Sequence, residues 1–240
     1  LPAQFGGAYQ VTAGQGRIGQ FTFLMLMFFL MIVGIIYVEQ GQRRIPIQFA
    51  KRVRGRKVMG GQSTYIPLKV NSAGVIPVIF ATSILFFPAL VATSLPQDNS
   101  VTAAIRNWID VNLANSQGTT WFYIFFLGIL IIFFTYFYTT IQFDPVRQSD
   151  MIRRQGGFVP GVRPGISTTN YLSHIINRIT LPGSIFLASV AVLPSIASAI
   201  WDIPLGFSGI SILITVGVAL ETMKQIESQL SMRNYEGFID

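Results

Sequence analysis

The chain has 240 residues, of which 51% are hydrophobic and 11% are charged. A soluble domain carries roughly a quarter charged residues, so this composition indicates a polytopic membrane protein. The sequence contains no cysteine, which excludes disulfides, thiol catalysis and Cys-ligated metals. It opens on Leu1 and Pro2 with no initiating Met and no signal peptide, and we expect it to be part of a longer protein.

Five apolar blocks are each close to the roughly 20 residues that a helix needs to cross about 30 Å of hydrocarbon. They predict an all-α polytopic fold with membrane helices at 19–38, 70–94, 120–143, 181–200 and 208–231. The segments around these helices are 1–18, 39–69, 95–119, 144–180, 201–207 and 232–240.

Charge sets the expected orientation of these helices. The 39–69 and 144–180 loops hold eight and five of the chain's seventeen Lys and Arg residues, whereas 95–119 and 201–207 hold one Arg and three Asp between them. Membrane proteins keep Lys and Arg in short cytoplasmic loops. We therefore expect both basic loops and the 232–240 tail in the cytoplasm, and the start of the chain outside.

The 39–69 loop has the pattern of a folded hairpin. Ile45, Ile47 and Phe49 alternate with polar or small residues, Arg54-Gly55-Arg56 is a plausible turn, and 58–68 can return as a second strand. Two interpretations of its basic residues stay open: topology control with attraction to anionic lipids, or a docking surface for RNA or an acidic protein. The candidate docking residues are Arg43, Arg44, Lys51, Arg52, Arg54, Arg56 and Lys57.

Prolines punctuate two of the predicted membrane helices. Pro77 and Pro88 fall inside the helix at 70–94, where each removes a backbone hydrogen bond and favours a bend. Thr82 or Ser83, or a water-filled interior, could supply partners for the freed carbonyls. Pro182 falls near the start of the fourth membrane helix, where its missing donor costs little.

The outer 95–119 segment predicts a short amphipathic helix. Val101, Ile105, Trp108 and Ile109 fall at helical spacing on one side, with the charged residues elsewhere. We expect this helix to lie at the outer interface with Trp108 at headgroup depth. The alternative is a disordered polar loop.

The 144–180 loop predicts a rigid turn between two helices. Gln155-Gly156-Gly157 is expected to end a short basic helix, and Ser167 or Thr168 to cap the next one. Between them, Arg163 stands between two Pro-Gly pairs, so its backbone has few alternative states. Arg163 is expected to make either a loop-stabilising or headgroup contact or a contact with a partner.

The sequence offers little for catalysis or ion coupling. The single histidine, His174, fits a solvated or capping role better than a metal site, and no Ser/His/Asp arrangement or paired carboxylate can be assembled within the membrane. The helix centres carry hydroxyls at most, which disfavours proton or sodium coupling. We expect a protein without enzymatic activity, and a passive pathway with apolar walls fits better.

Several long motifs follow one another along almost the whole chain: Val38 to Pro46, Gln62 to Asn71, Ala73 to Pro77 and Phe158 to Gly165. Together they closely resemble the SecY family, the channel subunit of the bacterial Sec protein translocon. The resemblance implies a ten-helix channel of two pseudo-symmetric halves in the bacterial plasma membrane. This chain resembles the carboxy-terminal half, with the sixth to tenth helices.

The resemblance also implies an activity and partners. Such a channel passes unfolded secretory proteins across the membrane and releases membrane proteins sideways through a lateral gate, without a cofactor or a metal. The implied partners are SecE and SecG, the SecA motor ATPase, the ribosome with its rRNA and proteins, the translocating polypeptide with its signal sequence, and anionic phospholipids.

By motif position, the resemblance assigns roles to individual residues. Ile79 and Ile214 would belong to the ring that closes the pore, and Ser83 and Phe87 to the lateral gate, which the helix at 120–143 would also help to form. Arg163, together with the basic hairpin residues, would dock SecA or the ribosome.

Two functions from other classes remain as alternatives. A secondary transporter would place charged or unwound sites in the rest of the protein and would be stabilised by its substrate. A receptor that only recruits ribosomes would dock them without conductance or peptide passage.

Overall fold

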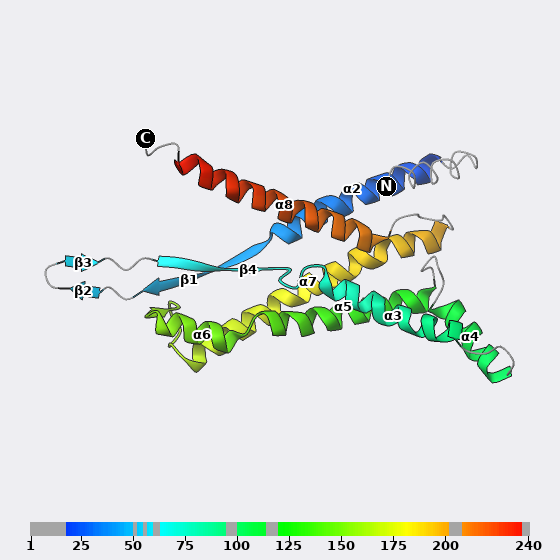
Figure 1. Ribbon diagram of the computed structural model, residues 1–240, viewed down its shortest axis with the longest axis horizontal. Helices are drawn as coiled ribbons and strands as arrows, with labels where there is room; N and C mark the ends of the chain where they lie inside the picture. The colour runs from blue at the N-terminus through cyan, green and yellow to red at the C-terminus, as the bar shows by residue number, and fades with distance from the viewer. Residues whose placement is uncertain are drawn as a thin grey trace.

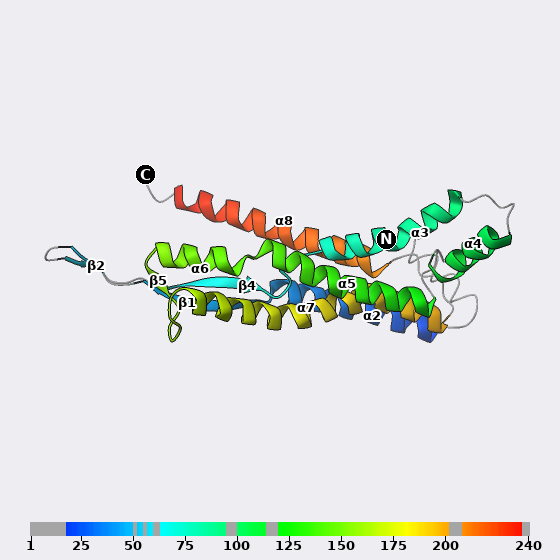
Figure 2. The ribbon, with the colours of Figure 1, turned by 90° about the horizontal axis from the view of Figure 1, so that it is seen from below.

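The computed structural model describes residues 18–49, 52–54, 57–59, 63–94, 100–113, 120–201 and 208–236. Within these ranges the molecule is elongated and mainly helical (Figures 1 and 2). The helices are α2 (Ile18–Gln40), α3 (Ile76–Ser94), α4 (Ser100–Asn112), α5 (Trp121–Gln142), α6 (Pro145–Arg154), α7 (Ile166–Trp201) and α8 (Gly209–Glu236). The strands are β1 (Gln42–Phe49), β2 (Arg52–Arg54), β3 (Lys57–Met59), β4 (Ser63–Lys69) and β5 (Gly157–Phe158).

Among the described residues, five helices are long and apolar enough to cross a membrane: α2, α3, α5, α7 and α8. Strands β1 and β4 pair antiparallel from Gln42↔Lys69 to Gln48↔Ser63. The expected all-α polytopic fold with an extended β-hairpin is therefore confirmed.

Helix α5 buries one stripe of side chains. Its buried residues recur every three or four positions, at Ile124, Leu127, Ile131, Thr135 and Thr139. This face packs against α7 and α3. The hydroxyls of Thr135 and Thr139 each donate to a carbonyl one turn earlier at 2.7 Å, so both buried groups are satisfied within the helix.

Helix α7 approaches its neighbours closely at two glycines. A Cβ on Gly183 would lie 2.7 Å from the carbonyl oxygen of Val70, and one on Gly209 of α8 would overlap the carbonyl oxygen of Val190. Pro194 follows Val190 by four residues, so this carbonyl lacks its helical donor. The contact at Gly209 joins two membrane helices, which associate by close approach at small residues where lipid provides no hydrophobic driving force.

A second hydrophobic core lies where the two basic loops meet. Strand β5 pairs with β1, giving a sheet of order β4-β1-β5. We call β1, β4, β5, α6, the 159–165 turn and 166–180 of α7 the extramembrane module, because the basic loops that form it are expected outside the membrane. Its buried residues are Ile45, Ile47, Leu68, Ile152, Val159, Leu172 and Ile175.

The module and α4 lie at opposite ends of the long axis in both views (Figures 1 and 2). Helix α4 is the helix expected within 95–119, and Trp108 meets Phe122 of α5 edge-on, with 5.5 Å between ring centroids. The segments expected on opposite sides of the membrane are thus separated in space.

The helix limits change the roles expected of two prolines. Helix α3 begins at Ile76, so Pro77 lies in its first turn, where its missing N–H breaks no helical hydrogen bond. The bend expected at Pro77 is therefore wrong, and Pro88 is the proline inside α3. Pro182 lies within the 36-residue α7 rather than near a helix start, because the loop helix and the membrane helix are continuous.

The hydroxyls of α3 do not serve its internal proline. Thr82 donates to the carbonyls of Val78 and Ile79 at 3.0 and 2.9 Å, and Ser83 donates to that of Ile79 at 2.8 Å. These acceptors precede the carbonyl of Ile84, which Pro88 leaves without its helical donor. The partnership suggested from sequence is therefore wrong.

Candidate functional site

The hairpin has one buried and one exposed face, as the period-two alternation of β1 requires. Ile45 and Ile47 are buried in the module. On the exposed face, the guanidinium carbon of Arg44 lies 4.8 Å from the ring centroid of Tyr65. This cation–π contact holds Arg44 at the surface. Arg43, at the start of β1, is also exposed.

The tip of the hairpin continues as the β2–β3 ladder, in which Arg54 pairs with Lys57. The ladder projects beyond α6 along the long axis (Figures 1 and 2). The Gly55-Arg56 part of the expected turn lies outside the described residues. Of the basic candidates at the tip, three lie on the ladder and two lie outside the described residues: Arg52, Arg54 and Lys57, then Lys51 and Arg56.

Contact between the two basic loops was not predicted from the sequence. Helix α6 ends at Arg154 and Gly156 has a φ of 72°, as the glycine pair indicated. Gly157 then enters β5 opposite Phe49. A Cβ there would lie 3.0 Å from side-chain atoms of Phe49 and of Ile47, so only glycine fits without a shift. The sequence signal that could have predicted this contact is Gly157, a second glycine directly after the helix-ending Gly156.

The turn that carries Arg163 is anchored to the module at several points. Val159 is buried, and its carbonyl accepts the N–H of Val162 at 3.1 Å. The carbonyl of Arg163 accepts the hydroxyl of Thr168 at 3.0 Å. The buried hydroxyl of Ser149 donates to the carbonyl of Gly165 at 3.1 Å.

These contacts fix the backbone of Arg163 while its side chain stays exposed. Gly161 and Gly165 have φ values of 81° and 112°, which side-chain-bearing residues rarely adopt. Helix α7 begins at Ile166, so the cap expected at Ser167 or Thr168 is wrong. The hydroxyl of Thr168 bonds the Arg163 carbonyl instead.

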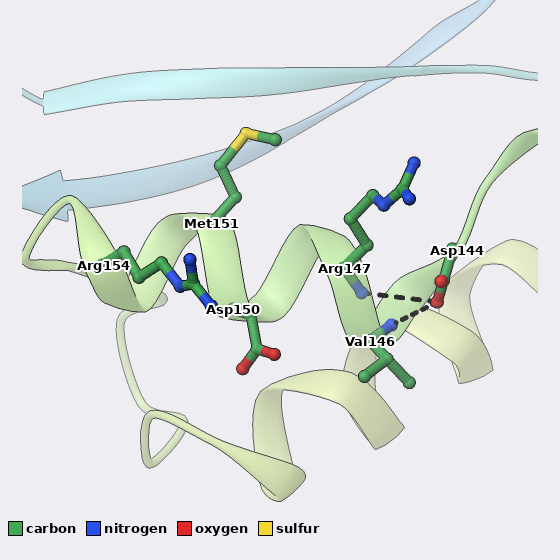
Figure 3. Close-up of a pocket in the computed structure, with 6 residues that line it drawn as sticks. All are labelled: Asp144, Val146, Arg147, Asp150, Met151 and Arg154. Carbon is green, nitrogen blue, oxygen red and sulfur yellow. Dashed lines mark hydrogen bonds between the residues drawn. The ribbon is translucent and has the colours of Figure 1, made fainter.

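A shallow hollow of about 520 Å³ runs along α6 (Figure 3). Asp144 caps this helix by accepting the backbone N–H groups of Val146 and Arg147 at 2.9 and 3.3 Å. Acids and arginines alternate in the lining, so no single charge dominates. No cluster of three or more His, Cys, Asp or Glu forms in the described part of the chain. The lining residues are Asp144, Val146, Arg147, Asp150, Met151 and Arg154.

The two candidate pore residues come from helices that run in opposite directions, α3 and α8 (Figure 1). Gly217 of α8 faces Val75, because a Cβ on Gly217 would lie 3.5 Å from Val75 Cγ2. Ile79 lies about one turn after Val75, and Ile214 lies about one turn before Gly217. Because the two helices run in opposite directions, both isoleucines lie toward the same end of the bundle from this contact. Ile79 is 47% exposed and Ile214 is 36% exposed within the chain.

The candidate gate residues continue the same side of α3. Ser83 and Phe87 follow Ile79 at intervals of four residues, and both are exposed. The opposite side of the helix buries Val78, Ala81 and other core residues. The described chain therefore leaves uncovered the stripe of α3 that carries the sequence-predicted positions.

Fold and site together define a multi-pass membrane protein with a basic, folded module at one end of its helices. The SecY family model matches residues 1–223. The chain therefore belongs to the SecY family.

Curated relatives support this membership. The protein translocase subunit SecY of Streptomyces coelicolor is 47% identical over 245 residues, covering 100% of this chain and 55% of that protein. The protein translocase subunit SecY of Mycobacterium tuberculosis is 48% identical over 227 residues, covering 91% and 51%. The chain thus spans about half the length of the curated relatives it matches.

Solved structures share the fold at lower identity. A structure described as a protein-conducting channel matches with a TM-score of 0.56 and 17% identity, covering 93% of this chain and 53% of that one. A SecY structure concerned with the plug domain matches with a TM-score of 0.55 and 15% identity, covering 93% and 54%.

Proposed function

We propose that the chain forms half of a protein-conducting channel in the bacterial plasma membrane. The channel passes unfolded secretory proteins across the membrane and releases membrane proteins laterally into it. The observation that carries this proposal is the uncovered stripe of Ile79, Ser83 and Phe87 on α3, with Ile214 beside it, in a chain of the SecY family.

An aliphatic wall suits this task for two physical reasons. It offers few directional contacts, so passing chains of any sequence are not held strongly. A closed apolar constriction also excludes water and ions by dewetting. Ile79 and Ile214 supply this half's part of the pore ring, and Ser83 and Phe87 its part of the lateral gate.

The extramembrane module supplies the docking surface for the driving partner. It lies in the cytoplasm, because its basic residues follow the positive-inside pattern. SecA or the ribosome docks on the hairpin and on the Arg163 turn, whose backbone is fixed and whose charge is exposed. SecE, SecG and anionic phospholipids complete the assembly, and this chain takes no catalytic part.

Site-specific crosslinking tests the proposal in a full-length SecY protein that carries this sequence and is assembled with its partners. A photoreactive side chain at position 79 should crosslink to a stalled secretory chain. Ile84 is a matched control, because it lies on another face of α3 and is also 47% exposed. Equal crosslinking at both positions, or none at position 79, would contradict the pore assignment.

A further inference from the structure

One partly buried polar contact links the root of the hairpin to the start of α3. The side-chain amide of Asn71 donates to Glu39 Oε2 at 2.9 Å. Asn71 is 6% exposed, and Glu39 is half-buried in the last turn of α2. The contact joins residues on either side of the whole hairpin, directly outside its first pair, Gln42↔Lys69.

The same asparagine also shapes the entry to α3. Its Oδ1 accepts the N–H of Gly74 at 3.1 Å, and its amide lies 3.3 Å from the carbonyl of Gly74. Gly74 has a φ of 64°, and α3 begins two residues later, at Ile76. One side chain therefore holds both the end of α2 and the turn that starts α3.

Backbone contacts hold the adjoining residue in place. The N–H of Val70 donates to the carbonyl of Gly41 at 3.0 Å. The carbonyl of Val70 faces Gly183 of α7, where a Cβ would come within 2.7 Å. The root of the hairpin is thus fixed to α2 and α7, and its side-chain link to α3 runs through Asn71.

Glu39 is an unexpected residue at this place for two reasons. A carboxylate in the last turn of a helix is unfavourable with the helix dipole. It also lies beside a strongly basic loop, yet the one ion pair among the described side chains joins Arg106 and Asp110 of α4. Residues that break a local rule in this way often serve function.

We propose that Glu39 and Asn71 form a joint that transmits docking at the hairpin to α3. Both are positioning residues, because neither lies on the exposed face of the hairpin or on the uncovered stripe of α3. The joint keeps the β1–β4 ribbon at a fixed angle to α3, so a load on the hairpin reaches the helix that carries Ile79, Ser83 and Phe87. The claim that docking is transmitted to α3 rests on the function proposed above. The contact between Glu39 and Asn71 that forms the joint does not depend on that function.

Three variants of a full-length SecY protein test the joint: Asn71→Asp, Glu39→Gln, and the two combined. Asn71→Asp places two carboxylates together, whereas the combined variant restores the contact between positions 39 and 71 with donor and acceptor exchanged and loses only the 3.3 Å contact of the Asn71 amide with the Gly74 carbonyl. Glu39→Gln keeps an acceptor for Asn71 and should be mild. Ser72→Ala is the control, since it removes a local hydrogen bond of 3.0 Å to Lys69 and leaves Glu39 untouched.

The first measurement needs no partner. Spin labels at two exposed positions, Gln48 on β1 and Leu90 on α3, report the angle between hairpin and helix, and this chain has no cysteine to interfere with labelling. The distance distribution should be narrow in the wild type, in Ser72→Ala and in the combined variant, and broad in Asn71→Asp. A narrow distribution in Asn71→Asp would overturn the joint even if the channel function proved wrong.

The second measurement separates docking from its consequence. Purified SecA should bind all variants within about threefold of wild type, while SecA-driven transport should fall about tenfold in Asn71→Asp, as loss of a hydrogen bond to a charged group predicts. The combined variant should recover transport. A loss of transport that the combined variant does not restore, or wild-type transport with a broad distance distribution, would overturn the coupling.

Discussion

The membrane helices and the extramembrane module bury their apolar residues in different ways. Between the membrane helices, large side chains such as Leu127 and Ile131 form a core, α7 and α8 meet at backbone level at Gly209, and a wide apolar face of α3 stays uncovered. In the module, large side chains such as Ile45 and Leu172 from separate segments fill one core. In a module outside the membrane, as proposed above, water drives the burial of apolar area, whereas lipid does not drive helices together. The bundle therefore depends on shape at a few positions, and the module on apolar area.

The largest effect on folding is expected from Gly209→Ala. The added Cβ would overlap the carbonyl of Val190, so α7 and α8 would have to separate. We expect a loss of more than about 4 kcal/mol in the free energy of unfolding, the range reserved for severe steric faults. Thermal unfolding and folded yield in detergent measure it.

Gly128→Ala is the matched control for this prediction. Gly128 lies within α5, and apart from its chain neighbours and its own helix backbone no atom lies within 4 Å of its would-be Cβ. Alanine there should be neutral or slightly stabilising, because it favours the helix. Similar unfolding temperatures for the two variants would break the view that the bundle depends on close approach.

The module should instead respond to lost side-chain volume. Leu172 is fully buried, and Leu172→Ala should cost about 3 kcal/mol through lost burial and the cavity left behind. Limited proteolysis should then cut the module faster and leave the membrane helices intact. Ile166→Ala, on the same helix at 82% exposure, should change nothing. Equal protection of both variants would contradict the second core.

The sequence predicted those parts of the fold that local patterns determine. Apolar length predicted the membrane helices, and the alternation at Ile45 and Ile47 predicted the hairpin. The pairing of β5 with β1 was missed because β5 has only two residues, which are too few to show the alternation of a strand. The continuity of α7 through Pro182 was missed because packing, such as that of Gly183 on Val70, overrides a local helix-breaking signal.

The candidate site was predictable to a different extent. The Pro-Gly pairs around Arg163 predicted a rigid turn, and the structure adds the hydrogen bonds that hold it. Ile79 and Ile214 came from the family resemblance alone, because periodicity cannot tell an isoleucine that faces a pore from one that faces lipid. The contact between Glu39 and Asn71 was missed, because nothing in the sequence pairs two residues across a hairpin.

Substituting asparagine for the two candidate pore residues, Ile79 and Ile214, sharpens the comparison within the membrane. If Ile79 and Ile214 line a constriction, Ile79→Asn or Ile214→Asn makes it easier to hydrate, with less than about 1 kcal/mol lost in stability, as for other exposed positions. Resting ion leak should rise in planar bilayers that contain the whole complex, and the need for a good signal sequence should relax.

The control for the pore substitutions is Ile84→Asn, which lies on another face of α3 with the same exposure as Ile79. It should leave conductance unchanged. Reduced folded yield with normal conductance for both pore variants would place these isoleucines in lipid or in packing, where burying an unpaired amide costs roughly 1 to 3 kcal/mol.

The smallest effect on stability, yet a severe effect on transport, is expected from Arg163→Glu. The side chain is exposed and its turn is held by backbone contacts, so the change should cost less than about 0.5 kcal/mol. Reversing a charge at a rigid, exposed site makes the proposed contact with SecA or the ribosome repulsive. Reversals in the hairpin cluster should act in the same direction but more weakly, because neighbouring charges share the contact.

Thr168→Val keeps the charge of Arg163 but removes the hydroxyl that holds its carbonyl, so an intermediate defect would show that rigidity contributes as well as charge. Transport assays with SecA and with the ribosome measure these defects. Wild-type rates in Arg163→Glu would exclude this turn as a docking site.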